Sequence, residues 1–223
     1  MAGLERKRLA VRGVSFDQLN TILCIGAHSD DIEIGAGATL LRLVRENPKA
    51  RIIWVVCAAS GARGEEARAS AAGFLKNAGQ SEVILKHFPD GHFPSAISEL
   101  KAFVEEFKPT NPDLILTHYG RDLHQDHRTV SEVTWNTFRS HTILEYEIPK
   151  WDGGLGSPNF FVPASVTDTD RKIELLTTCF ASQAEKHWFD DLTFRGLMRL
   201  RGLECNAAEH LAEGFYARKL SIG

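Results

Sequence analysis

The sequence predicts a Rossmann-like α/β fold, a three-layer sandwich in which helices cover both faces of a mostly parallel sheet. Short apolar runs alternate with longer segments of helical periodicity up to residue 146. Strand–helix–strand units of this kind join parallel strands through right-handed crossovers. A length of 223 residues suits one large α/β domain, so residues 1–223 are expected to form a single unit.

The predicted elements follow one another in a regular order. Strands are expected at 22–27, 52–58, 83–85, 114–117 and 143–146. Helices are expected around 37–44, 71–78, 97–107 and 130–137, where apolar residues recur at helical spacing. Asn47-Pro48, Gly79 and Pro109 mark the ends of the first three helices. Residues 147–165 are expected to form a long loop, and the chain beyond Asp168 is expected to be mainly helical.

Composition excludes several classes of partner. The formal net charge is −3, and Lys and Arg are spread along the chain without a basic block, so neither nucleic acid nor an anionic membrane is expected. The apolar run Ile52–Ala59 is too short to cross a bilayer, so no membrane insertion is expected. The oligomeric state stays open, a homo-oligomer included.

Two features indicate a cytoplasmic protein. The first 16 residues, MAGLERKRLAVRGVSF, are charged and contain no apolar core of a signal peptide. The four cysteines form no C-x-x-C pair, and Cys24 and Cys57 lie inside apolar runs, as buried free thiols of a reducing compartment do.

Two clusters of His and Asp follow predicted strands. The segment LCIGAHSDDIEIGAGATL, Leu23–Leu40, places His28, Asp30 and Asp31 after the first strand, and HYGRDLHQDH, His118–His127, follows the fourth. Ligands of such sheets bind beyond the carboxyl ends of the strands, and the doubly wound fold can bring these two ends together. Either cluster alone could be a buried histidine or a helix cap. Together they favour a metal site.

The spacing suggests which residues hold the metal. His28 and Asp31 are three residues apart across a strand-to-helix turn, so both can reach one ion, and His127 is the third candidate ligand. This mixture of nitrogen and oxygen ligands suits a divalent transition metal, with zinc as the first choice. Three protein ligands leave a position for water, as in hydrolytic rather than structural sites.

The remaining polar residues of the two clusters can carry protons. Asp30 is not needed as a metal ligand, so its carboxylate can take a proton from the water that attacks the substrate. His124 can stabilise an oxyanion or protonate the leaving group, and Asp126 can hold its imidazole in the required tautomer. His118 and Asp122 are assigned to the structure of the loop.

The glycines after the first cluster allow a different interpretation. GAGAT, Gly35–Thr39, resembles the start of a dinucleotide-binding G-x-G-x-x-G, but the last position falls on Leu40. The two preceding carboxylates would also repel a pyrophosphate. Gly35 and Gly37 are therefore expected to let the helix pack closely against the sheet.

These motifs resemble those of the PIG-L/LmbE family of metal-dependent deacetylases. Its A-H-P-D-D and H-P-D-H signatures correspond to Ala27-His28-Ser29-Asp30-Asp31 and His124-Gln125-Asp126-His127. The likeness extends over most of the chain through weaker matches, namely SGARGEEARASAAGFL (60–75), SPNFFVPAS (157–165), CFASQ (179–183) and AEGFYARK (212–219). Ser29 and Gln125 replace the two prolines of the signatures. Their loss loosens each turn but removes no ligand or proton carrier.

The resemblance implies a role for each motif residue. His28, Asp31 and His127 would bind the metal, Asp30 would be the general base, and His124, oriented by Asp126, the electrophilic or acid partner. Arg63 aligns with an arginine near the family's pocket and is a candidate substrate contact, with a solvated charge at a helix start as the equal alternative.

The sequence as a whole indicates a zinc-dependent hydrolase that removes an acetyl or other acyl group from the amide nitrogen of an amino sugar or glycoconjugate. Trp151, Phe160 and Phe161 of the long loop are candidates to face the sugar ring, or else anchor the loop. The alternatives are a non-catalytic sugar- or nucleotide-binding module and a metal-dependent hydrolase of another amide or ester, phosphate esters included.

Overall fold

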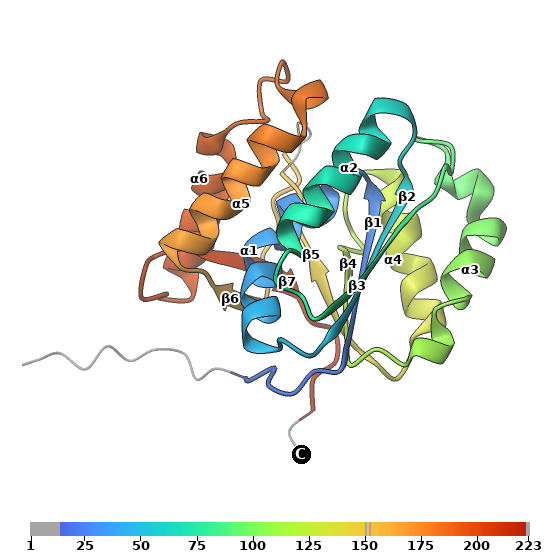
Figure 1. Ribbon diagram of the computed structural model, residues 1–223, viewed down its shortest axis with the longest axis horizontal. Helices are drawn as coiled ribbons and strands as arrows, with labels where there is room; N and C mark the ends of the chain where they lie inside the picture. Colours follow the sequence, from blue (N-terminus) through green and yellow to red (C-terminus); the bar gives the residue numbers. More distant parts are fainter. Residues whose placement is uncertain (1–13, 150, 152, 222–223) are drawn as a thin grey trace, which may run out of the picture.

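The computed structural model describes residues 14–149, 151 and 153–221 (Figure 1). Its strands are β1 (Thr21–His28), β2 (Arg51–Ala58), β3 (Gln80–Leu85), β4 (Leu114–His118), β5 (Thr142–Tyr146), β6 (Phe160–Pro163) and β7 (Ala212–Tyr216). Its α-helices are α1 (Asp31–Glu46), α2 (Gly61–Phe74), α3 (Ile97–Glu105), α4 (Gln125–Thr137), α5 (Val166–Cys179) and α6 (Asp191–Glu204). Short 3₁₀ turns lie at Phe93–Ala96, Lys108–Thr110 and Ala181–Gln183.

All of these strands join one sheet in the order β3-β2-β1-β4-β5-β7-β6. The first five are parallel, and β7 runs antiparallel between β5 and β6. The chain leaves β1 toward β2 and β3 and returns on its other side with β4, so β1 and β4 are neighbours where the strand order reverses. Open α/β sheets bind their ligands at such a point.

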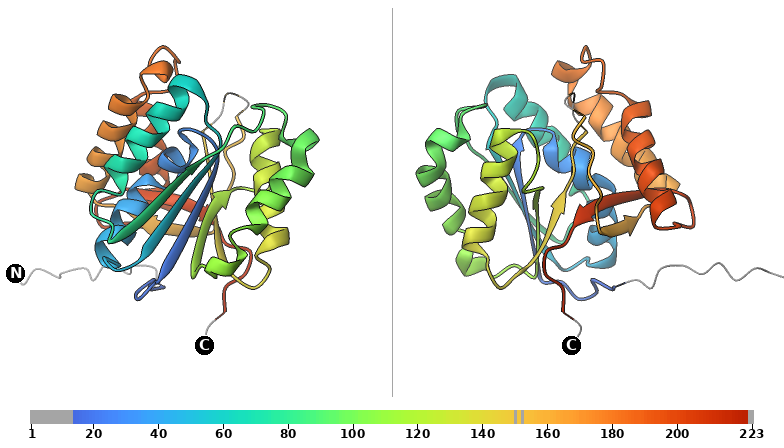
Figure 2. Two further views of the ribbon diagram at one scale, coloured as in Figure 1. Left: turned by 45° about the vertical axis from the view of Figure 1, so that its right-hand side comes forward. Right: turned by 180° about the vertical axis from the view of Figure 1, so that it is seen from behind.

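Helices cover both faces of the sheet, which confirms the predicted three-layer α/β architecture (Figure 2). Alternate residues of β1 face opposite sides. Ile22 and Cys24 pack into the apolar layer formed with α1, α2 and α5. Leu23 and Ile25 pack into the layer formed with α3 and α4. Because β1 is covered on both faces, its residues from Ile22 to Ala27 are buried, and only the end residues Thr21 and His28 are partly exposed.

Helix α1 packs very closely against the sheet at Gly35. A Cβ atom at this position would lie 2.3 Å from Cδ2 of the buried Tyr146 on β5. The close packing expected for Gly35 is therefore present. At Gly37 the neighbour is another helix, because a Cβ there would lie 2.9 Å from Cε1 of Phe74 on α2. The N-terminus of α1 is thus fixed directly beyond the end of β1.

The C-terminal part departs from the prediction. The segment 147–165 contains β6, and the region beyond Asp168 contains β7 as well as helices α5 and α6. Both strands are short, and β7 buries Glu213 and Gly214, so neither shows the apolar pattern of the first five strands. Helix α2 begins earlier than expected, because its inner face consists largely of small residues with little apolar signal.

Neither a membrane-spanning helix nor a signal peptide is expected from the sequence. None of the helices in the described part of the chain is long and apolar enough to cross a membrane. Residues 1–13, where no signal peptide is expected, lie outside the described residues.

Candidate active site

The two His/Asp clusters meet at the carboxyl ends of β1 and β4. His28 ends β1, Asp31 begins α1, and His127 lies in the first turn of α4. Nδ1 of His28 is 3.2 Å from Nε2 of His127 and 3.2 Å from Oδ2 of Asp31. Oδ1 of Asp31 is 3.5 Å from Nε2 of His127. The three predicted ligands therefore form a compact triangle, in which Asp31 faces His28 with Oδ2 and His127 with Oδ1. Two sets of described residues whose single ligand atoms all lie within 4.8 Å of one another, His28–His124–His127 and Asp31–His118–His127, divide these three ligands between them.

This triangle fits a divalent ion. A tetrahedral ion with ligand bonds of about 2.0–2.1 Å places its ligand atoms about 3.3 Å apart, which is close to the separation of the two histidine nitrogens and of each nitrogen from its nearer oxygen of Asp31. Two imidazole nitrogens and a carboxylate are the donor set that zinc accepts. Carboxylates also lie around His28 and His127, namely the buried Asp31, Asp122 and Asp126 and the exposed Asp90. Such an excess of carboxylates at a largely buried place favours a bound cation.

Local structure explains how these groups are aimed. The backbone N–H of His28 donates to Oδ2 of Asp31 at 2.6 Å, which turns the carboxylate back toward the end of β1. His124 caps the N-terminus of α4, where its Nδ1 accepts the backbone N–H of Asp126 at 3.2 Å. A neutral His124 therefore carries its proton on Nε2, which is the tautomer of a hydrogen-bond donor.

Asp30 lies beside the triangle and is held by Arg63. Its carboxyl group is buried, and Oδ1 accepts a hydrogen bond from Nη2 of Arg63 at 2.8 Å. Burial raises the pKa of Asp30, while the charge of Arg63 acts in the opposite direction. The contact seen for Arg63 is therefore with the expected base. Its role as a substrate contact stays a prediction, although its side chain lines the pocket.

Asp126 has different contacts from those expected. Its carboxylate accepts the backbone N–H groups of Gly91 and Phe93 at 2.6 and 3.0 Å, and Oδ2 lies 3.3 Å from Nε2 of His28. These contacts place Asp126 behind His28 and against the loop after β3. Its expected role of orienting the His124 imidazole stays a prediction.

Three residues of this cluster were not predicted to belong to the site. Asp122 lies with Oδ2 3.1 Å from Nδ1 of His127, an arrangement that commonly orients a metal-binding histidine. Nε2 of the buried His118 is 3.2 Å from Oδ2 of Asp31. Oδ1 of Asp90 is 3.1 Å from Nε2 of His28. His118 is the last residue of β4, whereas the turn after β4 determines where Asp122 points.

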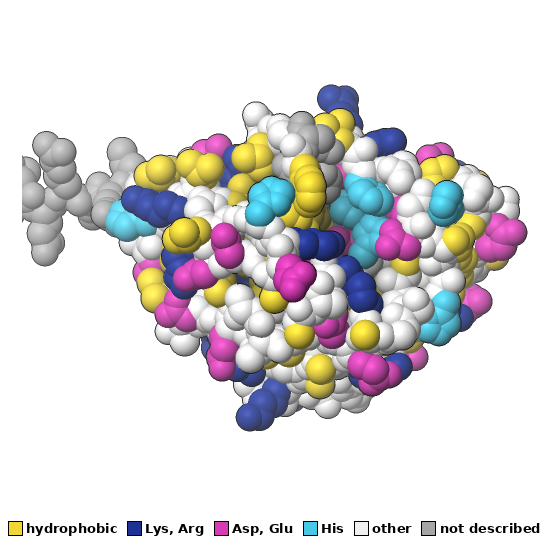
Figure 3. All heavy atoms as spheres, turned by 90° about the horizontal axis from the view of Figure 1, so that it is seen from above, with side chains coloured by type: hydrophobic (Ala, Val, Ile, Leu, Met, Phe, Trp, Pro, Cys, Tyr) yellow, Lys and Arg dark blue, Asp and Glu magenta, His cyan; other side chains and the backbone are white. Residues whose placement is uncertain are grey.

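The cluster forms the floor of a cavity of about 340 Å³. Figure 3 looks onto the carboxyl ends of the strands and shows histidines gathered in a depression with basic, acidic and apolar side chains at its edge. Two C-terminal segments supply its outer wall, with Ile148, Pro149, Trp151, Gln183, Lys186 and Trp188. Trp151 thus lines the pocket as expected.

The expectation for Phe160 and Phe161 as pocket residues is wrong. Both belong to the edge strand β6 and line a separate cavity. The ring of Phe160 packs against Phe16, with 5.8 Å between the ring centroids. Phe160 therefore anchors the strand, as in the alternative considered for it.

Comparison with known proteins identifies the family. The model of the family PIG-L, described as GlcNAc-PI de-N-acetylase, matches residues 23–138, which is more than half of the chain. This chain belongs to the PIG-L family. The matched region contains both motifs and all of the predicted site residues, and the resemblance deduced from the sequence is thereby confirmed.

Relatives of this PIG-L protein include the uncharacterized deacetylase YaiS of Escherichia coli (strain K12). The two are 33% identical over 140 residues, which covers 57% of this chain and 74% of YaiS. The N,N'-diacetylchitobiose deacetylase of Pyrococcus horikoshii has a similar structure, with a TM-score of 0.69, 17% identity and coverage of 90% of this chain and 84% of that chain.

The fold of the PIG-L protein is also shared by an enzyme that catalyses another reaction. GalB, the 4-carboxy-2-hydroxymuconate hydratase of Pseudomonas putida, has a TM-score of 0.73 at 16% identity, over 92% of this chain and 98% of that chain. At such low identity the structural likeness establishes the fold alone. The reaction must therefore be argued from the site.

Proposed function

We propose that the protein is a metal-dependent N-deacetylase, with zinc as the first candidate metal, that acts on an N-acetylated amino sugar or its glycoconjugate. One observation carries the proposal. Nitrogens of His28 and His127 lie 3.2 Å apart and within 3.2–3.5 Å of one or the other oxygen of Asp31, and a further buried carboxyl group, that of Asp30, lines the same pocket without belonging to the triangle. Membership of the PIG-L family supports the same conclusion.

The residues of the site divide the work of amide hydrolysis. His28, Asp31 and His127 would hold a divalent ion, which would supply Lewis acidity toward the amide carbonyl and toward water. Asp30 accepts the proton of the attacking water, whose oxygen then bonds to the carbonyl carbon. His124, with its proton on Nε2, can donate to the developing oxyanion. When the C–N bond breaks, the amine leaves with a proton from Asp30 or His124.

The pocket suits a sugar. A cavity of about 340 Å³ is at the lower end of the range for ligand sites and has room for one acetylated ring rather than a chain of residues. Trp151 and Trp188 offer aromatic faces to the C–H side of such a ring. The description of the matched family, GlcNAc-PI de-N-acetylase, supports this substrate class.

The experiment compares the parent protein with Asp30→Asn after loading both with zinc. The amide is nearly isosteric but accepts no proton from water, so kcat should fall about a hundredfold or more with the metal content unchanged. Released acetate or free amine is measured on N-acetylglucosamine conjugates and on acetyl-lysine peptides. An unchanged kcat would make Asp30 a helix cap, and faster hydrolysis of the peptides would reject the sugar while leaving the hydrolase.

The position of Asp30 beside the candidate metal ligands also argues against the other functions considered. A module that merely binds a sugar or nucleotide needs no spare carboxyl group beside a metal. A phosphate-ester hydrolase commonly uses two metals with additional carboxylate or basic ligands. A cytoplasmic location stays a prediction, and the oligomeric state stays open.

A further inference from the structure

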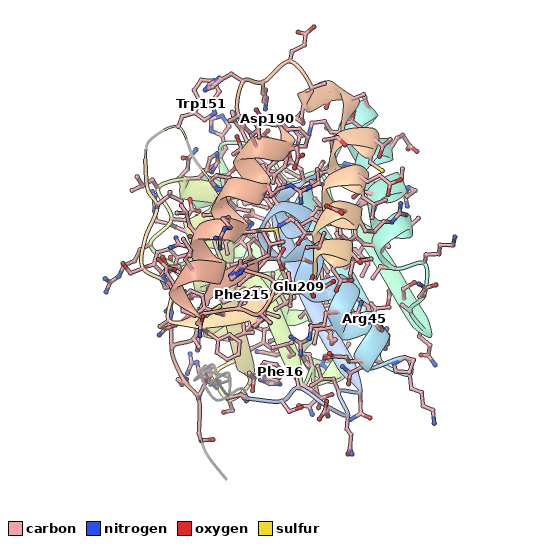
Figure 4. All side chains as sticks on the ribbon, turned by 90° about the vertical axis from the view of Figure 1, so that its left-hand side faces the viewer. Phe16, Arg45, Trp151, Asp190, Glu209 and Phe215 are labelled. Atoms are coloured by element: carbon pink, nitrogen blue, oxygen red, sulfur yellow. The ribbon has the colours of Figure 1, made fainter. Side chains whose placement is uncertain are left out.

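The outer part of the pocket wall, which contains Trp151, needs support from elsewhere in the protein, because, of its described residues between β5 and β6, only Ile148 is buried in the core. Ile148, Pro149 and Trp151 lie between β5 and β6, and none of them is part of a strand or helix. Trp151 is 73% exposed, and its ring meets the ring of His187 edge-on, with 4.7 Å between the centroids. Figure 4 shows Trp151 at the same end of the molecule as Asp190, which caps helix α6. So exposed a side chain contributes little packing to hold its own segment.

A single buried guanidinium ties both ends of this segment to α6. Nε and Nη2 of Arg201 donate to the two carboxylate oxygens of Glu147 at 2.6 and 2.7 Å. Nη2 also donates to the carbonyl oxygen of Gly156 at 3.1 Å, and Nη1 donates to Glu204 at 2.9 Å. Glu147 precedes the wall residues and Gly156 follows them. Arg201 therefore fixes the entry and the exit of the segment at one point.

The surroundings leave this arrangement little freedom. A Cβ atom at Gly214 of β7 would lie 2.9 Å from Oε1 of Glu147 and 3.2 Å from Cδ of Arg201. A Cβ atom at Gly156 would lie 2.1 Å from the hydroxyl oxygen of Tyr216. The side chains of Arg201 and Glu147 are only 6% and 9% exposed, so water screens their attraction weakly. Pro149 and Arg201 line the same small cavity, which places the ion pair directly behind the wall.

We propose that Arg201 is a positioning residue, which holds the wall of Ile148, Pro149 and Trp151 in place by binding Glu147 and Gly156. Arg201 does not line the pocket itself. Its loss should therefore weaken the binding of substrate without changing the metal site or the chemical step. The effect on substrate rests on the proposed function, whereas the effect on the position of Trp151 does not.

The test uses Glu147→Gln with Glu213→Gln as the matched control. Glu213 also belongs to a buried ion pair, with Lys172 at 2.7 Å, and lines the same small cavity. It binds α5 and the backbone of α1 instead of the wall segment. Both variants lose one buried charge, so a general loss of stability should appear in both.

Trp151 provides a readout that is independent of activity. The chain has four tryptophans, so 5-fluorotryptophan labelling should give a fluorine spectrum of four signals, in which Trp151→Phe identifies the Trp151 signal. We expect Glu147→Gln to shift or split this signal and to leave that of the core residue Trp54 in place. In Glu213→Gln the Trp151 signal should stay unchanged. A Trp151 signal that is unmoved in Glu147→Gln, or moved equally in both variants, would overturn the proposal.

Kinetics test the consequence for substrate. With an N-acetylglucosamine conjugate, Glu147→Gln should raise KM about fivefold, the scale of one lost hydrogen bond, and change kcat per bound metal by less than about twofold. Glu213→Gln should leave KM unchanged. Should Glu147→Gln fail to fold, Arg201→Lys keeps the charge but replaces the three nitrogens that bind Glu147, Gly156 and Glu204 by one, so the two-point contact with Glu147 is lost and the same shift is expected. A parent protein without deacetylase activity would refute the proposed function alone, because the fluorine spectrum would still decide the role of Arg201.

Discussion

Replacing Gly35 by alanine should destabilise the protein, although alanine is ordinarily the better residue in a helix. The new Cβ would lie 2.3 Å from Cδ2 and 2.9 Å from Cβ of Tyr146. The ring has nowhere to move, because Tyr146 is fully buried and its hydroxyl donates to the carbonyl oxygen of Ile25 at 2.8 Å. Helix α1 must therefore move away from β5. Since Asp31 begins this helix, the candidate metal ligands should shift as well.

Two opposing effects determine the magnitude of this change. Overpacking a well-filled core costs about 1–3 kcal/mol, whereas removing a glycine from a helix interior gains about 1 kcal/mol. The net expectation for Gly35→Ala is a loss of up to about 2 kcal/mol in the free energy of unfolding. For a chain of this size each kcal/mol lowers Tm by about 2–4 °C.

Gly196→Ala is the matched control, because Gly196 lies within α6 and a Cβ there would meet no atom within 4 Å. This variant should gain about 0.5–1 kcal/mol. Urea unfolding followed by circular dichroism gives both values. The two substitutions should differ in sign, and an equal gain from both would refute the argument that Gly35 is required by the close approach of Tyr146.

Three further predictions concern the candidate metal site. Removing a bound ion with a chelator should lower Tm, because a ligand at a hundred times its Kd stabilises the folded state by about 2.7 kcal/mol. In His28→Ala the chelator should have no effect on Tm, and elemental analysis should find little metal. Asp122→Asn should weaken metal binding about 10–100-fold in a competition with a coloured chelator, since it loses the carboxylate beside His127, and an unchanged affinity would separate Asp122 from the site. His124→Ala should lower kcat with the ion retained, whereas loss of the ion would make His124 a ligand.

The central sheet could be predicted because its strands are locally distinctive. The continuous apolar run from Ile52 to Cys57 has one structural solution in an α/β chain, a strand covered on both faces. Strand β7 could not be predicted in this way. It buries Glu213, whose charge is matched by Lys172 at a separation of 41 residues. No local pattern in the sequence indicates such an ion pair.

The contacts of the candidate site likewise fall into those that the sequence predicts and those that it does not. The approach of His28 and His127 followed from their places at the ends of two strands, because parallel strands bring their carboxyl ends to one edge of the sheet. The contact of Asp122 with His127 depends on the course of the turn after β4. The outer wall with Trp188 depends on how the segment between α5 and α6 lies over the sheet. Neither arrangement is encoded in the spacing of residues.

The pairing of β1 with β4 makes the metal site a late product of folding. His28 and His127 are 99 residues apart, and their nitrogens face each other only after β4 has docked beside β1. Contacts between such distant residues pay a large loop-closure entropy and therefore form slowly. An ion that requires both histidines would bind only chains in which the centre of the sheet is complete, and would draw the population away from partly folded forms. The yield of folded protein in a cell would then depend on the supply of metal as well as on temperature.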